Sequence, residues 1–165
     1  IVLCLALIAL SFFHFKATYD DIEKYTRNGI GVIGVGPDNA ENKTLYALRE
    51  VSTTVDSTIS PGEIVLAEWP GFLMDTKASF YPGLENHFGY GVGEKLSQDE
   101  RHRYKILSRR EIINIIKAGK APYVLLEEKS YNRLHKNNLS HYELVSNTRG
   151  TLFFKRIDND IKAKS

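Results

Sequence analysis

The side chains best suited to chemistry gather in residues 68–89, EWPGFLMDTKASFYPGLENHFG, which we call the 68–89 segment. It contains the carboxylates of Glu68, Asp75 and Glu85 and the imidazole of His87. Two carboxylates near a histidine can supply an acid, a base and a group that orients them, with burial or a neighbouring charge tuning their protonation. These residue types would suit a hydrolase or a transferase.

The same residue types also suit a loop that binds or packs without catalysis. The sequence has no nucleophile elbow, no H-E-x-x-H pair and no Cys/His spacing of a metal site, so we predict neither a metal nor a cofactor. Carboxylates in loops most often form caps and hydrogen bonds. We therefore predict substrate binding, without a catalytic role, for six residues: Trp69, Asp75, Tyr81, Glu85, Asn86 and His87.

A glycine-rich pattern precedes this segment. Gly29-Ile-Gly31-Val-Ile-Gly34 matches G-x-G-x-x-G, which in dinucleotide-binding proteins places a pyrophosphate on a helix N-terminus. The residues before it, DDIEKYTRN, do not resemble a strand, and Pro37 follows where the helix should begin. We therefore interpret Gly29–Gly36 as a flexible or extended connector.

Composition limits the possible classes of protein. The 165 residues, 42% of them apolar, suffice for one hydrophobic core. A net charge of +2 arises from 22 basic and 20 acidic residues that are interspersed, so we predict no nucleic-acid partner. The single cysteine, Cys4, excludes an intrachain disulfide.

The first fifteen residues, IVLCLALIALSFFHF, carry no charge and are apolar all round. We predict that residues 1–17 are the end of a transmembrane helix that begins upstream of Ile1, because a spanning helix needs about 20 apolar residues. A signal peptide is disfavoured, since there is no basic n-region and no small-residue cleavage site. The residues that follow lack the Lys/Arg excess of a cytoplasmic loop. We therefore expect 18–157 to form an extracytoplasmic domain and 158–165 a polar tail.

Within that domain, helical and extended patterns alternate. Apolar spacing predicts helices over 37–60, with Asp38 or Asn39 as N-cap, and from 108, with a Ser108–Glu111 capping box. Short apolar runs predict strands at 63–68 and 123–126, and a hairpin at 142–145 and 151–155. The fold class is α/β, a small mainly parallel sheet with flanking helices and an antiparallel C-terminal hairpin. Ligands in such sheets bind beyond the carboxyl ends of the strands, where the 68–89 segment begins.

Four motifs carry a resemblance to a known family. They are PGEIVLAEWPG at 61–71, YPGLENH at 81–87, LSRREI at 107–112 and APYVLL at 121–126. In this order, after a membrane helix and an amphipathic helix, they resemble the C-terminal soluble domain of polytopic C-type glycosyltransferases. These include relatives of the dolichyl-phosphate-mannose protein mannosyltransferases and of the bacterial aminoarabinose lipid A transferases. Gly29–Gly36 has no counterpart in this resemblance.

The resemblance implies a function. Such enzymes sit in the cell membrane and pass a sugar from a polyprenyl-phosphate donor to a protein, lipid or glycan acceptor on the extracytoplasmic side. Their catalytic carboxylate lies in an early loop, outside this chain, so no catalytic residue is carried over. The expected role here is acceptor binding or assembly with its own upstream membrane domain. The alternative is a singly membrane-anchored α/β module that binds a glycan or a partner protein.

Overall fold

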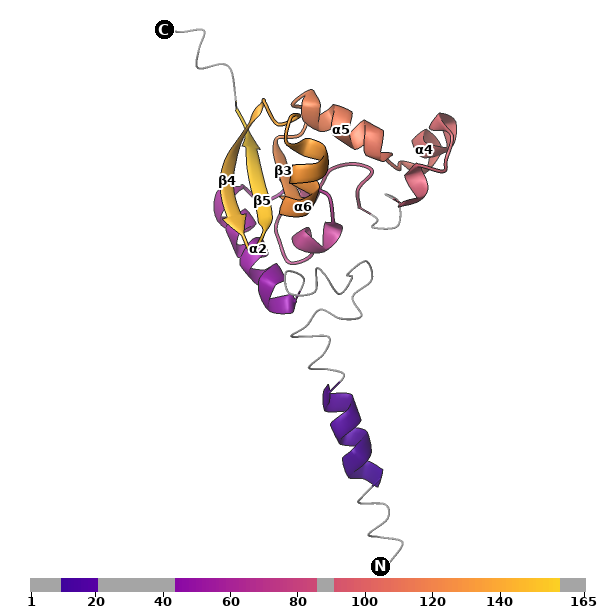
Figure 1. Ribbon diagram of the computed structural model, residues 1–165, viewed down its shortest axis with the longest axis vertical. Coiled ribbons are helices and arrows are strands. Elements are labelled where there is room, and N and C mark those ends of the chain that lie inside the picture. The colour runs from indigo at the N-terminus through magenta and orange to yellow at the C-terminus, as the bar shows by residue number, and fades with distance from the viewer. Residues whose placement is uncertain (1–9, 21–43, 86–90, 158–165) are drawn as a thin grey trace, which may run out of the picture. The chain divides into compact units, whose positions relative to one another are not determined.

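The computed structural model of the protein describes residues 10–20, 44–85 and 91–157 (Figure 1). The chain divides into two compact units, Ile1–Leu48 and Arg49–Ser165. In the first unit, residues 10–20 form a helix in which the Thr18 hydroxyl donates to the carbonyl of His14 at 2.9 Å. The Gly29–Gly36 connector lies outside the described residues.

The apolar N-terminal stretch is described only in part. Large side chains of the helix over 10–20 are exposed, among them Phe12, Phe13 and Phe15. No helix in the described ranges is both long enough and apolar enough to cross a membrane. Residues 1–9, half of the predicted membrane segment, are not among those ranges, so the truncated membrane helix over 1–17 stays a prediction.

Helix α2 (Leu45–Thr58) begins later than the sequence pattern predicted. The Thr44 hydroxyl accepts a hydrogen bond from the Ala47 amide at 3.1 Å, which is the bond that an N-cap side chain makes. The cap of α2 is therefore Thr44, and the prediction of Asp38 or Asn39 is wrong. The apolar spacing that predicted this helix starts only at Leu45, inside the observed element, and a threonine that satisfies an otherwise unpaired amide sets its start.

The second unit contains a five-stranded sheet in the order β2-β1-β3-β5-β4. Its strands are β1 (Ile64–Ala67), β2 (Ser79–Phe80), β3 (Tyr123–Glu127), β4 (Tyr142–Thr148) and β5 (Thr151–Arg156). β1 pairs in parallel with both β2 and β3, whereas β5 pairs antiparallel with β3 and with β4. This confirms the predicted α/β class with an antiparallel C-terminal hairpin. It adds β2, which the sequence analysis did not find.

The central strands are buried on both faces, which explains their uninterrupted apolar runs. Leu66, Val124 and Phe154 face α5 (Arg109–Lys117), whose Ile112 and Ile116 complete a core cluster. On the other face, the ring of Tyr123 stacks on that of Phe153 with centroids 5.7 Å apart. Figure 1 shows α2 running behind β4 and β5, where the hydroxyls of Thr54 and Thr148 are 3.3 Å apart.

The path of the chain through the sheet prepares the site. After β1 the chain forms a short 3-10 helix, η3 (Pro70–Leu73), and returns as β2 on one side of β1. From β2 it passes through α4 (Gln98–Tyr104) and α5 to β3 on the other side of β1. β3 then continues into α6 (Glu128–Ser130) and a π-helical turn, η4 (Tyr131–His135).

Truncating Ile116 tests this packing. Its side chain is fully buried in the cluster that joins α5 to the sheet, so Ile116→Ala should lower the free energy of unfolding by about 3 kcal/mol. The exposed Asn114 of the same helix offers a control, and Asn114→Ala should change stability by less than about 0.5 kcal/mol. Equal losses in urea denaturation would contradict the orientation of α5.

Candidate functional site

The carboxyl ends of the parallel strands β1 and β3 lie side by side, and the connections that leave them run in opposite directions along the sheet. The chain leaves β1 toward β2 and leaves β3 toward the hairpin on the opposite side of the sheet. Open α/β sheets form ligand crevices at such points. Glu68 follows β1 directly, its amide donates to the carbonyl of Leu125 at 3.1 Å, and Glu127 ends β3. Two carboxylates therefore occupy this edge.

Glu68 links the two strand ends through its side chain. Its Oε1 accepts a hydrogen bond from the hydroxyl of Ser130 at 2.5 Å. Burial raises the pKa of the Glu68 carboxyl; the Ser130 hydrogen bond opposes this rise, and the negative charge of Glu127 adds to it. The positive charges of Arg109 and Arg133 oppose the rise more weakly.

Ser130 is held by the turn that follows β3. The amide of Glu128 donates to the carbonyl of Gly150 at 2.8 Å, which ties α6 to the β4–β5 turn. The ring of Tyr131 stacks on Phe154 with centroids 5.6 Å apart. The Oε2 atom of Glu68 is inaccessible to solvent, and Oε1 is held by Ser130, so in this structure the carboxyl serves to orient two strand ends.

Trp69 points into the protein. Its side chain is only 6% exposed and meets Phe72 edge-on, with centroids 5.1 Å apart. A Cβ built on Gly71 would lie 2.2 Å from Cη2 of Trp69, so only glycine lets the η3 backbone run this close to the indole. In this structure the ring packs over the end of β1 and does not present a stacking face to solvent.

Tyr81 and Glu85 belong to one turn after β2. The amide of Tyr81 donates to the carbonyl of Val65 at 3.0 Å, and its half-buried ring packs on the core cluster. Burial raises the pKa of the Tyr81 hydroxyl. Glu85 is exposed, and its Oε2 accepts from the amide of Gly83 at 2.8 Å. The turn requires Gly83, whose φ is +93°.

Of the remaining candidates, the structure describes only Asp75. Asp75 is exposed beside Met74, at the end of η3. Asn86 and His87 lie outside the described residues. The structure thus places Tyr81 and Glu85 on one turn and buries Trp69 against Phe72.

A hollow of about 580 Å³ opens beside the Pro82-Gly83 turn. We call it the α4 hollow. Its other walls are α4 and the chain that leads to α5, with the lining residues Gln98, Asp99, Arg101, His102, Arg103, Lys105, Ile106, Leu107 and Glu111. None of these residues was predicted to belong to a site. The stretch SQDERHRYKIL is polar and has no apolar periodicity, so no element could be placed there from the sequence. The signal it contained was a second Ser-x-x-Glu pattern, at Ser97 and Glu100.

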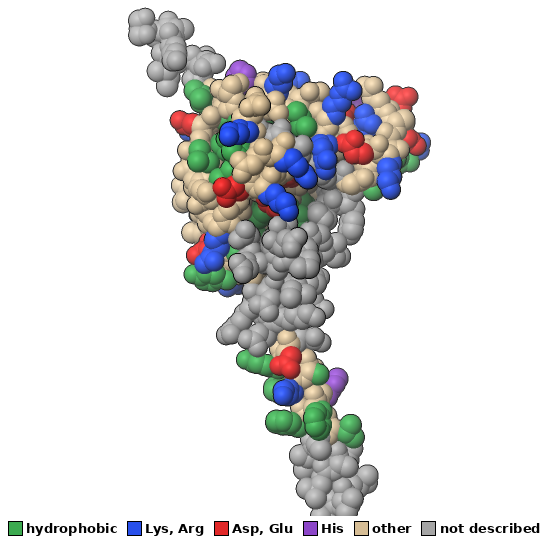
Figure 2. Space-filling view, in the orientation of Figure 1, with side chains coloured by type: hydrophobic (Ala, Val, Ile, Leu, Met, Phe, Trp, Pro, Cys, Tyr) green, Lys and Arg blue, Asp and Glu red, His purple; other side chains and the backbone are tan. Residues whose placement is uncertain are grey.

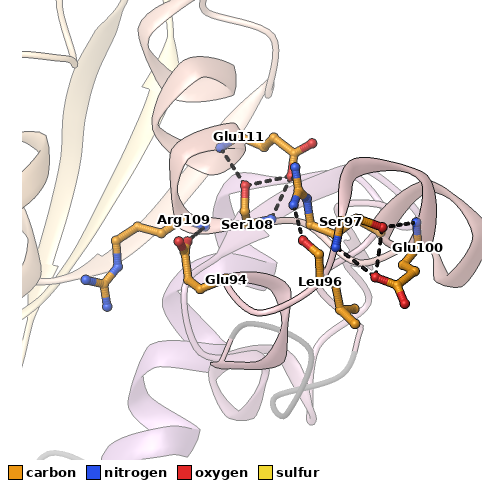
Figure 3. Close-up of polar contacts among 8 residues, drawn as sticks. Glu94, Leu96, Ser97, Glu100, Ser108, Arg109 and Glu111 are labelled. Atoms are coloured by element: carbon orange, nitrogen blue, oxygen red, sulfur yellow. Dashed lines mark hydrogen bonds and ion pairs between the residues drawn. The ribbon is translucent and has the colours of Figure 1, made fainter.

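Two capping boxes begin the helices beside this hollow, and Figure 3 shows their hydrogen bonds. Ser97 pairs with Glu100 at the start of α4, and Ser108 pairs with Glu111 at the start of α5, as predicted for the second box. Burial alone would raise the pKa of Glu111, but hydrogen bonds from the amide and hydroxyl of Ser108 and from Arg101 lower it below its usual range. The hydrogen bonds from Ser97 likewise lower the pKa of Glu100.

Arg101 joins the two boxes. Its Nε donates to Oε2 of Glu111 at 3.0 Å and its Nη1 donates to the carbonyl of Leu96 at 2.6 Å (Figure 3). Glu94 adds a further link, because its Oε1 accepts from the amide of Arg109 at 2.6 Å. α4 is thus fixed to the start of α5 by polar contacts.

Comparisons with known proteins add no assignment. Neither a scan against protein-family models nor searches of curated proteins and of solved structures found a match to this chain. Function must therefore be inferred from the residues and their geometry.

The raised pKa of Glu68 predicts a pH dependence of stability. Between the unfolded value near 4.5 and the folded pKa, the folded state holds a proton that the unfolded state has lost. The free energy of unfolding should therefore fall as pH rises through this window. Glu68→Gln keeps an acceptor for Ser130 and should remove that fall in urea titrations between about pH 4.5 and about pH 8. Glu128→Gln, at an exposed position of α6, should retain it; a fall that persists in Glu68→Gln would contradict the assignment.

The Pro82-Gly83 turn gives a second test with a matched control. Gly62 and Gly83 both have positive φ, of +85° and +93°, so alanine at either should cost about 1–2 kcal/mol from backbone strain. Only at Gly83 would the new Cβ also clash, 2.8 Å from Cγ of Leu107. Gly83→Ala should therefore lower the thermal midpoint more than Gly62→Ala does. Equal shifts of the thermal midpoint in the two variants would show that Gly83 is not packed against Leu107.

Proposed function

We propose that this chain is the extracytoplasmic domain of a membrane glycosyltransferase that moves a sugar from a polyprenyl-phosphate donor to a protein, lipid or glycan acceptor. In this proposal the domain holds the acceptor or assembles with the enzyme's membrane domain, and the catalytic carboxylate lies elsewhere in the enzyme.

The observation that carries the proposal is that the four motifs of the resemblance meet in one place. The strands of motifs 61–71 and 121–126 pair directly, with Val65 opposite Tyr123. Motif 81–87 begins at Tyr81, whose amide bonds to Val65, and its Gly83 packs against Leu107 of motif 107–112. Residues far apart in sequence thus form one structural unit, as the proposal requires of motifs that belong to one domain.

The roles of the carboxylates favour binding over chemistry. Glu68 ties strand ends together, Glu85 accepts from a turn amide, and Glu111 completes a capping box. A general acid or base must reach the reacting atoms of its substrate. These three carboxylates are engaged with the protein's own donors, so the proposal assigns hydrogen bonding and orientation to this domain.

The Tyr81–Glu85 turn is the part of the 68–89 segment that we assign to acceptor binding. The Tyr81 hydroxyl would donate to a sugar oxygen, and Glu85 would accept from a sugar hydroxyl through an oxygen not used by Gly83. Trp69 is buried against Phe72, so in this proposal it supports the fold of the 68–89 segment and does not contact the sugar. Asn86 and His87 follow in the chain and stay candidates for further hydrogen bonds.

Variants that preserve the fold test the assignment in membranes that contain the full-length protein. Tyr81→Phe and Glu85→Gln should each raise the KM for the acceptor by up to about tenfold, the value of one hydrogen bond of about 1.4 kcal/mol. Because the reacting groups lie elsewhere, kcat should change little. The measurement is transfer of labelled sugar from a polyprenyl-phosphate donor at equal protein level.

Glu143→Gln serves as the control, since Glu143 is exposed on β4 and lies outside the turn. An unchanged KM in both turn variants would refute acceptor binding here. A lower kcat with an unchanged KM would instead assign chemistry to the turn. Glycan binding by a full-length protein that transfers no sugar from any polyprenyl-phosphate donor would favour the singly anchored binding module.

A further inference from the structure

Packing against the rest of the protein does not account for the stability of helix α4. Its seven residues, Gln98–Tyr104, bury no side chain, and it projects away from the sheet in Figure 1. A helix this short is marginal in water unless other contacts hold it. Here those contacts are polar: the Ser97 capping box and the two hydrogen bonds of Arg101.

The chain after α4 is strained at a residue that lines the α4 hollow. Lys105 ends the helix with φ +52° and ψ +50°, the left-handed conformation that helix ends usually assign to glycine. Side-chain-bearing L-residues adopt it at a cost in free energy, and such outliers cluster at ligand sites. Lys105 nevertheless carries a charged side chain at this position, and it is an exposed residue that lines the hollow.

The chemistry of the hollow suits an anion attached to an apolar body. Arg103, Lys105 and His102 line one wall, while Pro82, Ile106 and Leu107 supply apolar surface. Of the two acidic lining residues, Glu111 is already held by Ser108 and Arg101. Basic side chains occur among acidic ones over the visible surface in Figure 2, so charge alone does not single out this place. The concavity and the strain do.

Arg101 adds a further donor. Its side chain is 19% exposed, and its printed hydrogen bonds use Nε and Nη1. Among the described residues Nη2 has no hydrogen-bond partner, although Arg101 lines the hollow. A guanidinium held rigidly on one side is well suited to give its remaining N–H groups to a phosphate oxygen.

We propose that the α4 hollow binds the phosphate group of a compound that also carries an apolar body, through Arg101, Arg103 and Lys105. A volume of about 580 Å³ lies within the range of small-molecule sites. The phosphate can be presented by a lipid headgroup or by a dissolved phosphate ester. This inference does not depend on the proposed sugar transfer.

Lys105→Gly gives a sharp test because stability and binding should move in opposite directions. Glycine relieves the left-handed strain, so the thermal midpoint should rise, whereas binding of hexyl phosphate should weaken by about tenfold or more through loss of the ammonium. The matched control is Arg149→Gly. Arg149 also has positive φ, of +49°, but does not line the hollow, so hexyl phosphate should bind unchanged.

Binding is measured by calorimetry on the full chain, with hexyl phosphate, inorganic phosphate and hexanol as probes. We expect hexyl phosphate to bind more tightly than inorganic phosphate and hexanol not to bind. Vesicles of phosphatidylcholine with and without phosphatidic acid then distinguish the two sources. A phosphatidic-acid-dependent increase that Lys105→Gly removes assigns the phosphate to a membrane, and no such increase assigns it to a dissolved ester. Absence of hexyl phosphate binding, or an equal loss in Arg149→Gly, overturns the proposal.

Discussion

The rest of the second unit depends on the pairing of β1 with a strand on each side. Val65, Leu66 and Ala67 are buried, so their backbone amides and carbonyls must find partners within the sheet. The carbonyl of Val65 accepts from Tyr81, and the carbonyl of Leu125 accepts from Glu68. These bonds fix where the Tyr81–Glu85 turn starts and where Glu68 enters the edge of the sheet. The Tyr81–Glu85 turn is therefore positioned by the need of one short buried strand to pair its backbone amides and carbonyls.

The edge of the sheet also shows how a buried carboxylate is tolerated. Desolvation disfavours the charge of Glu68, and Glu127 adds repulsion, while the Ser130 hydroxyl and two arginines act in the opposite direction. The hydrogen bond from Ser130 to Glu68 joins the end of β1 to the turn after β3. Strand pairing does not reach this far, because the last paired residues are Ala67 and Leu125. A polar group therefore specifies the relative position of two strand ends, although an apolar contact could bury as much area.

The sequence predicted those elements of the fold that a local pattern of adjacent residues determines. It did not predict the site, which depends on contacts between residues far apart in sequence. Uninterrupted apolar runs identified β1 and β3, and Ser108 with Glu111 identified the start of α5 because a capping box needs only four adjacent residues. β2 escaped because two residues, Ser79 and Phe80, have no periodicity, and their strand exists only through pairing with β1. Trp69 was predicted to bind a ligand because residue types alone do not show whether an aromatic ring is buried by the protein or exposed to solvent. The α4 hollow required Gly83 and Leu107, distant in sequence, to come into contact.

Among the residues that the structure describes, two that carry side chains have left-handed backbone, Lys105 and Arg149, and the causes differ. Arg149 and Gly150, with φ of +49° and +71°, connect β4 to β5, and a two-residue hairpin loop of this handedness requires positive φ at both positions because it matches the twist of the strands. Topology therefore accounts for Arg149. Lys105 ends a helix that buries nothing, and glycine would end it at lower cost. What distinguishes Lys105 from glycine at this position is an exposed, charged side chain on a residue that lines the hollow. The proposed phosphate ligand would account for the strain.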